Sequence, residues 1–333
     1  MSKKDDQKSL TINTPLPYCA EEFLIYMESI KGKSENTVRE YRYDLISFFS
    51  YFAENENVKY IDELDDDFLR KIRLADLYRY INHLSKDLKL AATSRARKVA
   101  SLRSFFKYLH SKAHIIDTNP AIDLESPKLT KKLPVYLKLD ESRQLLSSVK
   151  GENEARDYCI LTLFLNCGMR LSELCGINIT SIKDNTVVVR GKGDKERTIY
   201  LNEACENAIT DYLRVRTVLP ENDPDADALF LSERKKRISR RAVQYTVKKY
   251  LTAAGIDPEK YSTHKLRHTA ATLMYQYGDV DIRSLQEILG HESISTTEIY
   301  THVNSEKLAE AVRANPLAGE SKSHNVKDES DNG

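Results

Sequence analysis

Apolar residues recur every three or four positions through the first third of the chain, a spacing that places them on one face of an amphipathic helix. Ser34, a residue type that favours helix N-caps, precedes the second of four such stripes. The four stripes are Phe23, Leu24, Met27 and Ile30; Val38, Tyr41, Leu45, Phe48, Phe49 and Phe52; Leu74, Leu77, Tyr78, Ile81 and Leu84; and Val99, Leu102, Phe105, Phe106 and Leu109. They predict an all-helical domain over residues 16–125 with one shared core.

The helical pattern stops at Pro120, because the residue before a proline is held out of the α region. Residues 126–135 are rich in proline and lysine, and we predict that they form a linker between two domains. The two ends of the chain are polar and without periodicity. We expect them to form disordered tails, residues 1–15 and 317–333.

Residues 136–316 combine helical stripes with one β-rich patch, and we predict a second domain there. Two β-branched runs, residues 186–189 and 198–201, flank a loop that contains two glycines, which is typical of a β-hairpin. The fold class predicted for the whole chain is therefore mainly α with a small β-sheet. Helices are predicted at residues 203–218, 239–254, 265–277, 281–289 and 304–313.

Length and composition fit this division. A chain of 333 residues is long enough for two cores, and it contains no apolar run of about 18 residues that could span a membrane. The charged N-terminus lacks a signal-peptide pattern, so we expect a cytoplasmic protein without a membrane partner. The cysteines show no close pairing, which predicts reduced and mostly buried thiols: Cys19, Cys159, Cys167, Cys175 and Cys205.

The formal net charge is only +1, which by itself argues weakly against a polyanionic partner. The charges are unevenly distributed, however, with basic runs at residues 95–98, 128–132 and 234–241 and an acidic run at 62–67. Any one basic run is as readily explained by a solvated helix face. Read as contacts to DNA phosphates, the basic residues of interest are Arg95, Arg97, Lys98, Arg103, Lys107, Arg240 and Arg241.

The second domain also contains five short segments with residues suited to chemistry on a phosphate. In chain order they are Gly168-Met169-Arg170-Leu171-Ser172-Glu173-Leu174, Gly191-Lys192-Gly193, His264-Lys265-Leu266-Arg267-His268-Thr269, Leu289-Gly290-His291 and Ile299-Tyr300-Thr301-His302-Val303. Together they resemble the tyrosine recombinase, or phage integrase, family, and within it the bacterial Xer recombinases that resolve chromosome dimers. The resemblance extends from about residue 16 to residue 316.

The resemblance implies a role for each matching residue. Tyr300 would be the nucleophile that forms a 3′-phosphotyrosine, Lys192 the lysine of the β-hairpin, and Glu173 the acidic residue that helps to hold the first arginine. The implied catalytic set is Arg170, Lys192, His264, Arg267, His291 and Tyr300.

The resemblance also implies an architecture and partners. An all-helical core-binding domain and an α/β catalytic domain would form a C-shaped clamp on double-stranded DNA that carries a specific recombination site. The active assembly would be a homotetramer, or a heterotetramer with a paralogous recombinase. A septal DNA translocase is a further implied partner.

The same residues suit phosphoryl transfer without reference to any family. Arginine offers a planar, permanently charged fork for phosphate oxygens. Tyrosine, with an ordinary pKa of about 10, needs neighbouring cations or a base before it can attack. Lys192 could protonate the departing 5′ oxygen, although the nearby Lys195 is a rival. A phosphotyrosine conserves the energy of the broken ester, so no nucleotide or other cofactor is expected.

Three alternatives remain open at this point. A zinc site could use His264, His268 and His291, but Arg267 would place a cation beside the metal and the glutamate of the metalloprotease motif is missing, so no metal is predicted. A type IB topoisomerase would share the chemistry and relax supercoils as a monomer. A non-catalytic DNA-binding protein would need only the basic runs, with each motif arginine and most of the 19 tyrosines structural.

Overall fold

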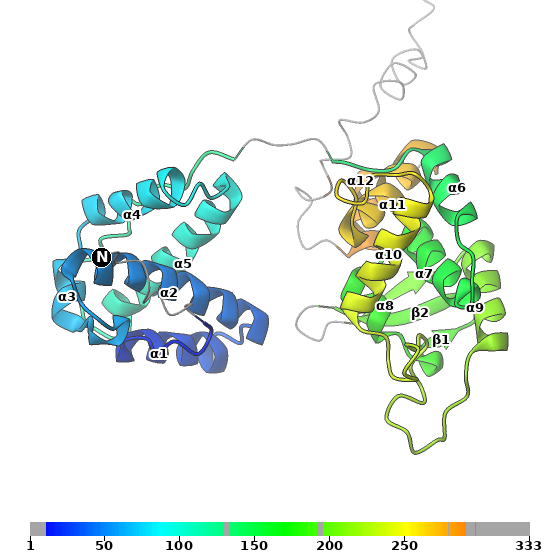
Figure 1. Ribbon diagram of the computed structural model, residues 1–333, viewed down its shortest axis with the longest axis horizontal. Helices are drawn as coiled ribbons and strands as arrows, with labels where there is room; N and C mark the ends of the chain where they lie inside the picture. Colours follow the sequence, from blue (N-terminus) through cyan, green and yellow to red (C-terminus); the bar gives the residue numbers. More distant parts are fainter. Residues whose placement is uncertain (1–10, 130–133, 192–195, 279, 291–296, 298–333) are drawn as a thin grey trace, which may run out of the picture. The chain divides into compact units, whose positions relative to one another are not determined.

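The chain divides into two compact units, Met1–Lys131 and Lys132–Gly333 (Figure 1). Within the described residues the first unit is helical and the second combines helices with a three-stranded sheet, which confirms the predicted mainly α fold class with a small β-sheet. The computed structural model describes residues 11–129, 134–191, 196–278, 280–290 and 297.

The predicted helical stripes of the first unit correspond to four of its helices. Ser34 caps the second of them as expected, since its Oγ accepts a hydrogen bond from the backbone N–H of Thr37 at 3.4 Å. A short π-helical turn, Tyr26–Ile30, and a 3₁₀ turn, Ile61–Glu63, complete the unit. Its α-helices are α1 Tyr18–Ile25, α2 Glu35–Glu56, α3 Asp66–Lys71, α4 Leu74–Lys86 and α5 Ala92–Ser111.

Aromatic rings form the centre of the first unit. The ring centroids of Phe49, Phe52, Tyr80 and Phe106 lie between 4.9 and 5.8 Å from that of Phe48. Most of these contacts are edge-to-face, a geometry that contributes about 0.5–1.5 kcal/mol per pair beyond the area buried. The rings come from α2, α4 and α5, so this cluster joins the three helices into one core.

Two residues of the predicted stripes do not belong to that core. Ile30 is 72% exposed, because the π-helical turn that contains it rotates the apolar face by about one residue. Tyr78 is also exposed, and its hydroxyl donates to the carbonyl of Asp123. Tyr80, which the pattern missed, is fully buried in its place, at the i+3 position from Leu77.

The second unit contains the predicted hairpin and one strand that was not predicted. Strands β2, Thr186–Arg190, and β3, Glu196–Tyr200, pair antiparallel, with Val188 opposite Thr198. The additional strand β1, Ile182–Lys183, pairs with the other edge of β2 and is too short to show a periodicity of its own. The α-helices of this unit are α6 Leu139–Ser147, α7 Glu154–Cys167, α8 Leu171–Gly176, α9 Glu203–Val215, α10 Arg240–Ala253, α11 Thr263–Tyr277 and α12 Ile282–Leu289.

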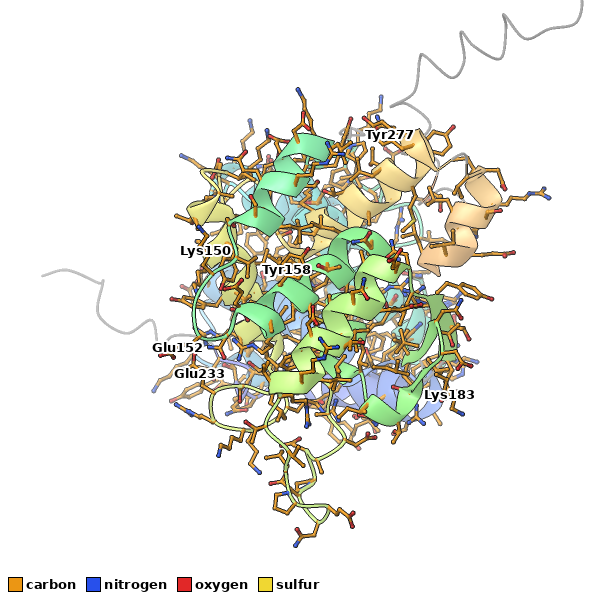
Figure 2. All side chains as sticks on the ribbon, turned by 90° about the vertical axis from the view of Figure 1, so that its right-hand side faces the viewer. Lys150, Glu152, Tyr158, Lys183, Glu233 and Tyr277 are labelled. Carbon is orange, nitrogen blue, oxygen red and sulfur yellow. The ribbon has the colours of Figure 1, made fainter. Side chains whose placement is uncertain are left out.

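Helix α7 is the central element of the second unit. Its residues from Cys159 to Leu165 are all buried, and it packs against α9 and α11. Tyr158 of α7 and Tyr277 at the end of α11 project instead toward solvent, 40% and 68% exposed (Figure 2). The predicted helix over residues 304–313 lies outside the described residues.

The five cysteines are free and buried, which confirms the prediction from their spacing. Cys167 of α7 and Cys205 of α9 lie with their sulfur atoms 3.5 Å apart. Burial raises the pKa of the Cys175 thiol to about 11, so this group stays protonated near neutral pH. None of the described helices is both long and apolar enough to cross a membrane.

Candidate active site

A sharp turn between α7 and α8 places the first motif arginine. Gly168 ends α7 with φ +59°, a left-handed conformation that glycine adopts without strain. A Cβ at this position would lie 2.9 Å from Cδ2 of Leu289, so the turn packs directly against the end of α12. Arg170 then serves as the N-cap of α8, with 37% of its side chain exposed.

Glu173 holds Arg170 twice. One carboxylate oxygen accepts the backbone N–H of Arg170 at 2.7 Å, and the other accepts from Nη1 of its guanidinium, also at 2.7 Å. The side chain of Glu173 is fully buried in the first turn of α8. The contact that the family resemblance implies between these two residues is therefore present, and it fixes both the backbone and the side chain of Arg170.

A second arginine, Arg197 of β3, shares the same carboxylate and was missed in the sequence. Its Nε and Nη2 donate to the two oxygens of Glu173 at 3.1 and 2.8 Å. The alternation of inward- and outward-facing side chains along β3 could have indicated this buried arginine. Arg197 lies on the same strand face as the buried Ile199, and a charge on the buried face of a strand needs a partner.

Arg267, the second motif arginine, is almost completely buried in α11, at 3% exposed. Its Nη1 donates to the carbonyl of Gly168 at 2.7 Å and lies 3.9 Å from the carboxylate of Glu173. The guanidinium is thereby held against the turn that precedes Arg170. The structure thus brings both motif arginines to the same buried glutamate.

The C-terminal end of α12 closes this group of residues. Its last carbonyls have no partner inside the helix and carry the negative end of the helix dipole. Three consecutive carbonyls each accept from a different arginine at 2.5 Å: Ile288 from Arg197, Leu289 from Arg267 and Gly290 from Arg170. We call Arg170, Glu173, Arg197 and Arg267 the arginine cluster.

The arginine cluster carries excess positive charge, because three guanidinium groups share one carboxylate. Burial by itself raises the pKa of Glu173, but the hydrogen bond and charge of Arg197, followed by the bonds from Arg170, outweigh it and hold that pKa below its ordinary value. Glu173 is therefore ionised near neutral pH. The remaining positive charge suits a phosphodiester group.

His264 lies in the first turn of α11, beside the arginine cluster. Partial burial of its ring, and then the charges of Arg267, Lys265 and Arg170, lower its pKa below the ordinary value of 6.5. The ring is therefore neutral near pH 7. It contacts His268 one turn later, with ring centroids 4.5 Å apart. A neutral imidazole can accept a proton, so His264 has a protonation state suited to a base.

The rest of the predicted catalytic set lies outside the described residues. Lys192 belongs to the segment that joins β2 to β3, His291 directly follows Gly290 in the sequence, and Tyr300 comes nine residues later. The residues of the predicted set that the structure describes and brings together are Arg170, Glu173, His264 and Arg267.

In the first unit, a buried carboxylate holds part of the predicted DNA-binding set. Asp44 of α2 accepts hydrogen bonds from Arg97 at 2.6 Å, Lys98 at 3.1 Å and Ser101 at 2.6 Å. Lys98 is buried, so its charge stabilises the packing of α2 against α5 and we leave it out of the proposed DNA contacts. Arg97 remains partly exposed.

The other basic residues predicted for DNA differ in their surroundings. Arg103 and Lys107 are exposed and four positions apart, hence on one face of α5, and Arg103 also donates to the carbonyl of Leu124. Arg95 is half-buried. In the second unit, Arg240 and Arg241 are exposed in the first turn of α10, where the helix dipole disfavours cations. Such a placement favours an anionic partner.

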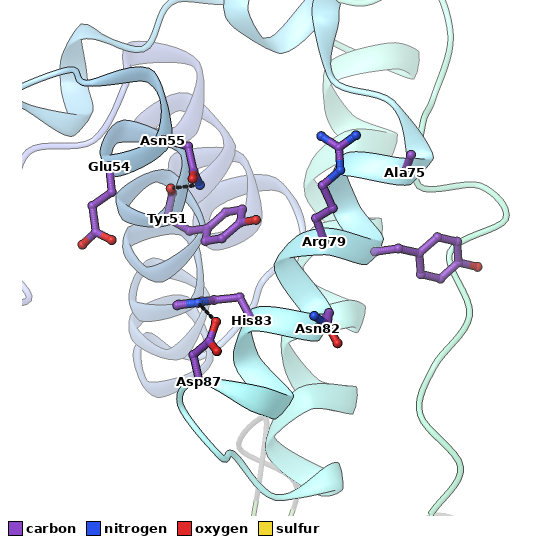
Figure 3. A pocket seen from close by; sticks show the side chains of 9 residues that line it. Tyr51, Glu54, Asn55, Ala75, Arg79, Asn82, His83 and Asp87 are labelled. Carbon is purple, nitrogen blue, oxygen red and sulfur yellow. Dashed lines mark hydrogen bonds and ion pairs between the residues drawn. The ribbon is translucent and has the colours of Figure 1, made fainter.

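An open hollow of about 740 Å³ lies between α2 and α4 of the first unit (Figure 3). Its walls include Tyr51, Arg79, and the hydrogen-bonded pair of His83 Nδ1 and the carboxylate of Asp87, 2.8 Å apart. None of the predicted catalytic or DNA-binding residues lines it, and we assign it no role in the reaction.

Family models match both units of the chain. The model described as the phage integrase family matches residues 136–307, and the model described as the phage integrase N-terminal SAM-like domain matches residues 20–113. These two matches include every residue of the arginine cluster and the seven basic residues predicted to contact DNA.

Curated relatives match along most of the chain. The tyrosine recombinase XerC of Caldanaerobacter subterraneus subsp. tengcongensis is 50% identical over 325 residues, which cover 94% of this chain and 92% of the relative. The tyrosine recombinase XerC of Thermodesulfovibrio yellowstonii is 37% identical over 306 residues, covering 90% of this chain and 96% of the relative.

A solved structure shares the fold. The XerH site-specific recombinase, in a post-cleavage complex with a palindromic difH substrate, aligns with a TM-score of 0.68 at 23% identity, covering 89% of this chain and 84% of that chain. At this identity the likeness concerns the arrangement of helices and strands alone.

Proposed function

Since the chain belongs to the phage integrase family and is a site-specific tyrosine recombinase that breaks and rejoins DNA, we propose that Tyr300 is its nucleophile and carries the cut strand as a 3′-phosphotyrosine. The observation that supports this assignment most is the arginine cluster. It holds Arg170 and Arg267 on one buried carboxylate, in the sequence order that the family motif requires.

In the proposed reaction the phenol oxygen of Tyr300 attacks the phosphorus, and the bond from phosphorus to the 5′ oxygen breaks. The proton of the phenol passes to a histidine base, His264 or His291, and the departing 5′ oxygen takes a proton from Lys192. Arg170 and Arg267 stabilise the charge that develops on the non-bridging oxygens. Attack by a 5′ hydroxyl on the phosphotyrosine reverses every step without a cofactor.

The described geometry supports distinct roles for the two arginines. Arg170 is partly exposed and has donors beyond those given to Glu173 and Gly290, so it can reach a phosphate directly. Arg267 is buried and bonded to two carbonyls. Its charge would act on a phosphate at the edge of the cluster, and it also lowers the pKa of His264.

We further propose that both units contact double-stranded DNA. Exposed arginines and lysines of α5 and of the first turn of α10 would bind phosphates and position the duplex, while recognition of bases sets the target site. The predicted closing of the two domains around DNA as a clamp is part of this proposal. The proposed phosphate contacts are Arg95, Arg97, Arg103, Lys107, Arg240 and Arg241.

The number of protomers in the active assembly follows from the number of DNA strands that must be cut. One tyrosine cuts one strand, so exchange between two duplexes needs four protomers, in a homotetramer or in a heterotetramer with a paralogous recombinase. The Xer resemblance favours chromosome dimer resolution in the cytoplasm as the cellular role, with a septal DNA translocase as partner. The type IB topoisomerase alternative is not favoured, because the relatives that match this chain along most of its length are recombinases.

A covalent complex on DNA tests this proposal. The wild-type protein first selects a duplex from a randomised library, and that duplex is nicked near its centre so that the short cut product is lost and the adduct accumulates. In EDTA, we expect a denaturing gel to show a protein–DNA adduct for the wild type and none for Tyr300→Phe. Tyr277→Phe, which removes an exposed hydroxyl of α11, is the matched control and should behave as the wild type.

Other outcomes identify the alternatives. The absence of a wild-type adduct on the selected duplex would favour a protein that only binds DNA. A requirement for added zinc would favour the metal site. Relaxation of a supercoiled plasmid that lacks the selected site would favour a topoisomerase.

A further inference from the structure

Resting on the proposed function, we propose that Arg197 is a positioning residue for strand cleavage: from β3 it ties Glu173 to the end of α12 and so fixes Arg170 and Gly290, the residue that precedes His291 in the sequence. The side chain spans two partners that belong to different helices. Nε and Nη2 bind the carboxylate of Glu173, and Nη1 donates to the carbonyl of Ile288.

These contacts engage all three guanidinium nitrogens of Arg197 with protein atoms. Its side chain is 15% exposed, against 37% for Arg170. Arg197 is therefore oriented toward the fold, whereas Arg170 can reach a phosphate. We infer that Arg197 acts through its neighbours and does not contact DNA.

Arg197 determines how Glu173 is oriented. Each oxygen of Glu173 accepts one hydrogen bond from Arg170 and one from Arg197. Without Arg197, one donor would be lost from each oxygen of a fully buried carboxylate, and the group could rotate or recruit a neighbour in its place. Arg170, which is held by the same two oxygens, would then lose its fixed direction.

The stem of Arg197 packs against the residue that leads into the second motif histidine. Gly290 has φ +62°, and a Cβ added there would lie 2.8 Å from Cδ of Arg197. The stem thus occupies the space that only a glycine leaves open. Together with the bond to Ile288, this contact fixes the point from which the chain continues to His291.

Arg197 also holds the end of the hairpin that lies next to its connecting segment. It is the second residue of β3 and pairs with Val189 of β2, close to the segment that contains Lys192. A single side chain therefore links the hairpin, the helix that begins after Arg170, and the end of α12. In the sequence, these three elements adjoin Lys192, Arg170 and His291 of the proposed catalytic set.

The test compares Arg197→Gln and Arg197→Lys with Arg190→Gln. Arg190 lies on β2 of the same hairpin, is 71% exposed and pairs, among the described residues, with Glu196, so its loss removes equal charge without touching the arginine cluster. The probe is the nicked duplex selected by the wild-type protein. Two quantities are measured for each variant, the dissociation constant for that duplex and the rate constant of adduct formation at saturating protein.

We expect Arg197→Gln to lower the rate constant about 100-fold while the dissociation constant changes less than about threefold, because a misplacement of about 1 Å at a reacting group has that effect. Arg197→Lys keeps the charge but cannot span both partners, so an intermediate loss of about tenfold is expected. Arg190→Gln should match the wild type in both quantities.

The pH dependence of adduct formation provides a readout that a merely structural residue would not move. Glu173 is faced by Arg170 from α8, Arg197 from β3 and Arg267 from α11. Burial raises the pKa of Glu173, and Arg197 is the main group that opposes it. Arg197→Gln should therefore have a higher Glu173 pKa than the wild type, and the acid limb of its rate profile should move to higher pH. Arg190→Gln should leave that limb in place.

The outcomes separate this inference from the proposed function. If the wild type forms no adduct, the proposed function fails. If the wild type forms an adduct and Arg197→Gln forms it at the rate of Arg190→Gln, the positioning role of Arg197 is wrong. Should Arg197→Gln fail to fold, Arg197→Lys decides, and a loss of rate fully explained by its unfolded fraction would overturn the proposal.

Discussion

The guanidinium of Arg170 donates from Nη2 to the carbonyl oxygen of Gly290 at 2.5 Å, across 120 residues of sequence. Gly290 is the last residue before His291, so this bond joins the first motif arginine to the approach of the second motif histidine. The same carbonyl run binds Arg267 and Arg197. The end of α12 therefore organises the arginine cluster as much as Glu173 does.

Gly290→Ala should disrupt this organisation. The added Cβ would meet Cδ of Arg197 at 2.8 Å, so we expect a loss of adduct formation of at least tenfold. Gly255→Ala is the matched control, because Gly255 has a similar φ of +69° but open space around its Cβ. Both variants should lose about 1 kcal/mol of stability from the left-handed backbone. Equal cleavage rates in the two would contradict the role given to this contact.

The predicted helices and the hairpin could be found in the sequence because their signals are local. Stripes of apolar residues indicate helices, and β-branched runs around a glycine loop indicate a hairpin; both patterns depend only on residues within a few positions of each other. Contacts between distant residues carry no such signal. Asp44 and Lys98 are 54 positions apart, and only the structure shows that Lys98 is committed to a buried ion pair. The local pattern had placed it on a basic surface.

The candidate site divides in the same way. The resemblance of the five motif segments to the tyrosine recombinase family was sufficient to name Arg170, Glu173, His264 and Arg267 as candidates. The partnership of Arg197 with Glu173 was missed, because arginines in loops and strands of a charged segment are common and the ion pair spans 24 positions. The role of the α12 carbonyls could not be predicted either, since a backbone acceptor has no sequence signature.

Removal of the buried charge should destabilise the second unit. Glu173→Gln leaves three arginines without their shared carboxylate, and breaking a buried ion pair costs about 3–5 kcal/mol. Asp211→Asn removes a carboxylate from an exposed pair with Arg214 and should change stability by less than about 0.5 kcal/mol. Urea unfolding of the two variants measures the difference, and similar midpoints would argue against the importance of the cluster for the fold.

Acid should abolish the contribution of Glu173. Its pKa in the folded protein lies below the ordinary value of 4.5, so its stabilisation is complete above that value and is lost as the pH falls through the folded pKa. We expect the difference in unfolding free energy between the wild type and Glu173→Gln to be constant from pH 7 to about 5 and to shrink below about 4.5. A difference that persists undiminished at pH 3 would show that the charge is not its source.

The basic first turn of α10 should contribute to DNA affinity through phosphates. The double variant Arg240→Ala, Arg241→Ala should weaken binding to all duplexes and reduce the slope of log K against log salt by about 2, since each neutralised phosphate contributes about 0.9. Lys248→Ala removes an exposed charge of the same helix that pairs with Glu259, and it serves as the control. An unchanged slope in the double variant would remove these arginines from the interface.

The most direct test of the central claim is to locate the DNA on the protein. Trypsin cleavage after Arg283 and Lys307 releases residues 284–307, a peptide whose single tyrosine is Tyr300. After digestion of the trapped adduct with trypsin and nuclease, mass spectrometry should find a nucleotide attached to this peptide at Tyr300. A nucleotide on any other peptide, or an adduct that survives in Tyr300→Phe, would contradict the assignment of Tyr300 as the nucleophile.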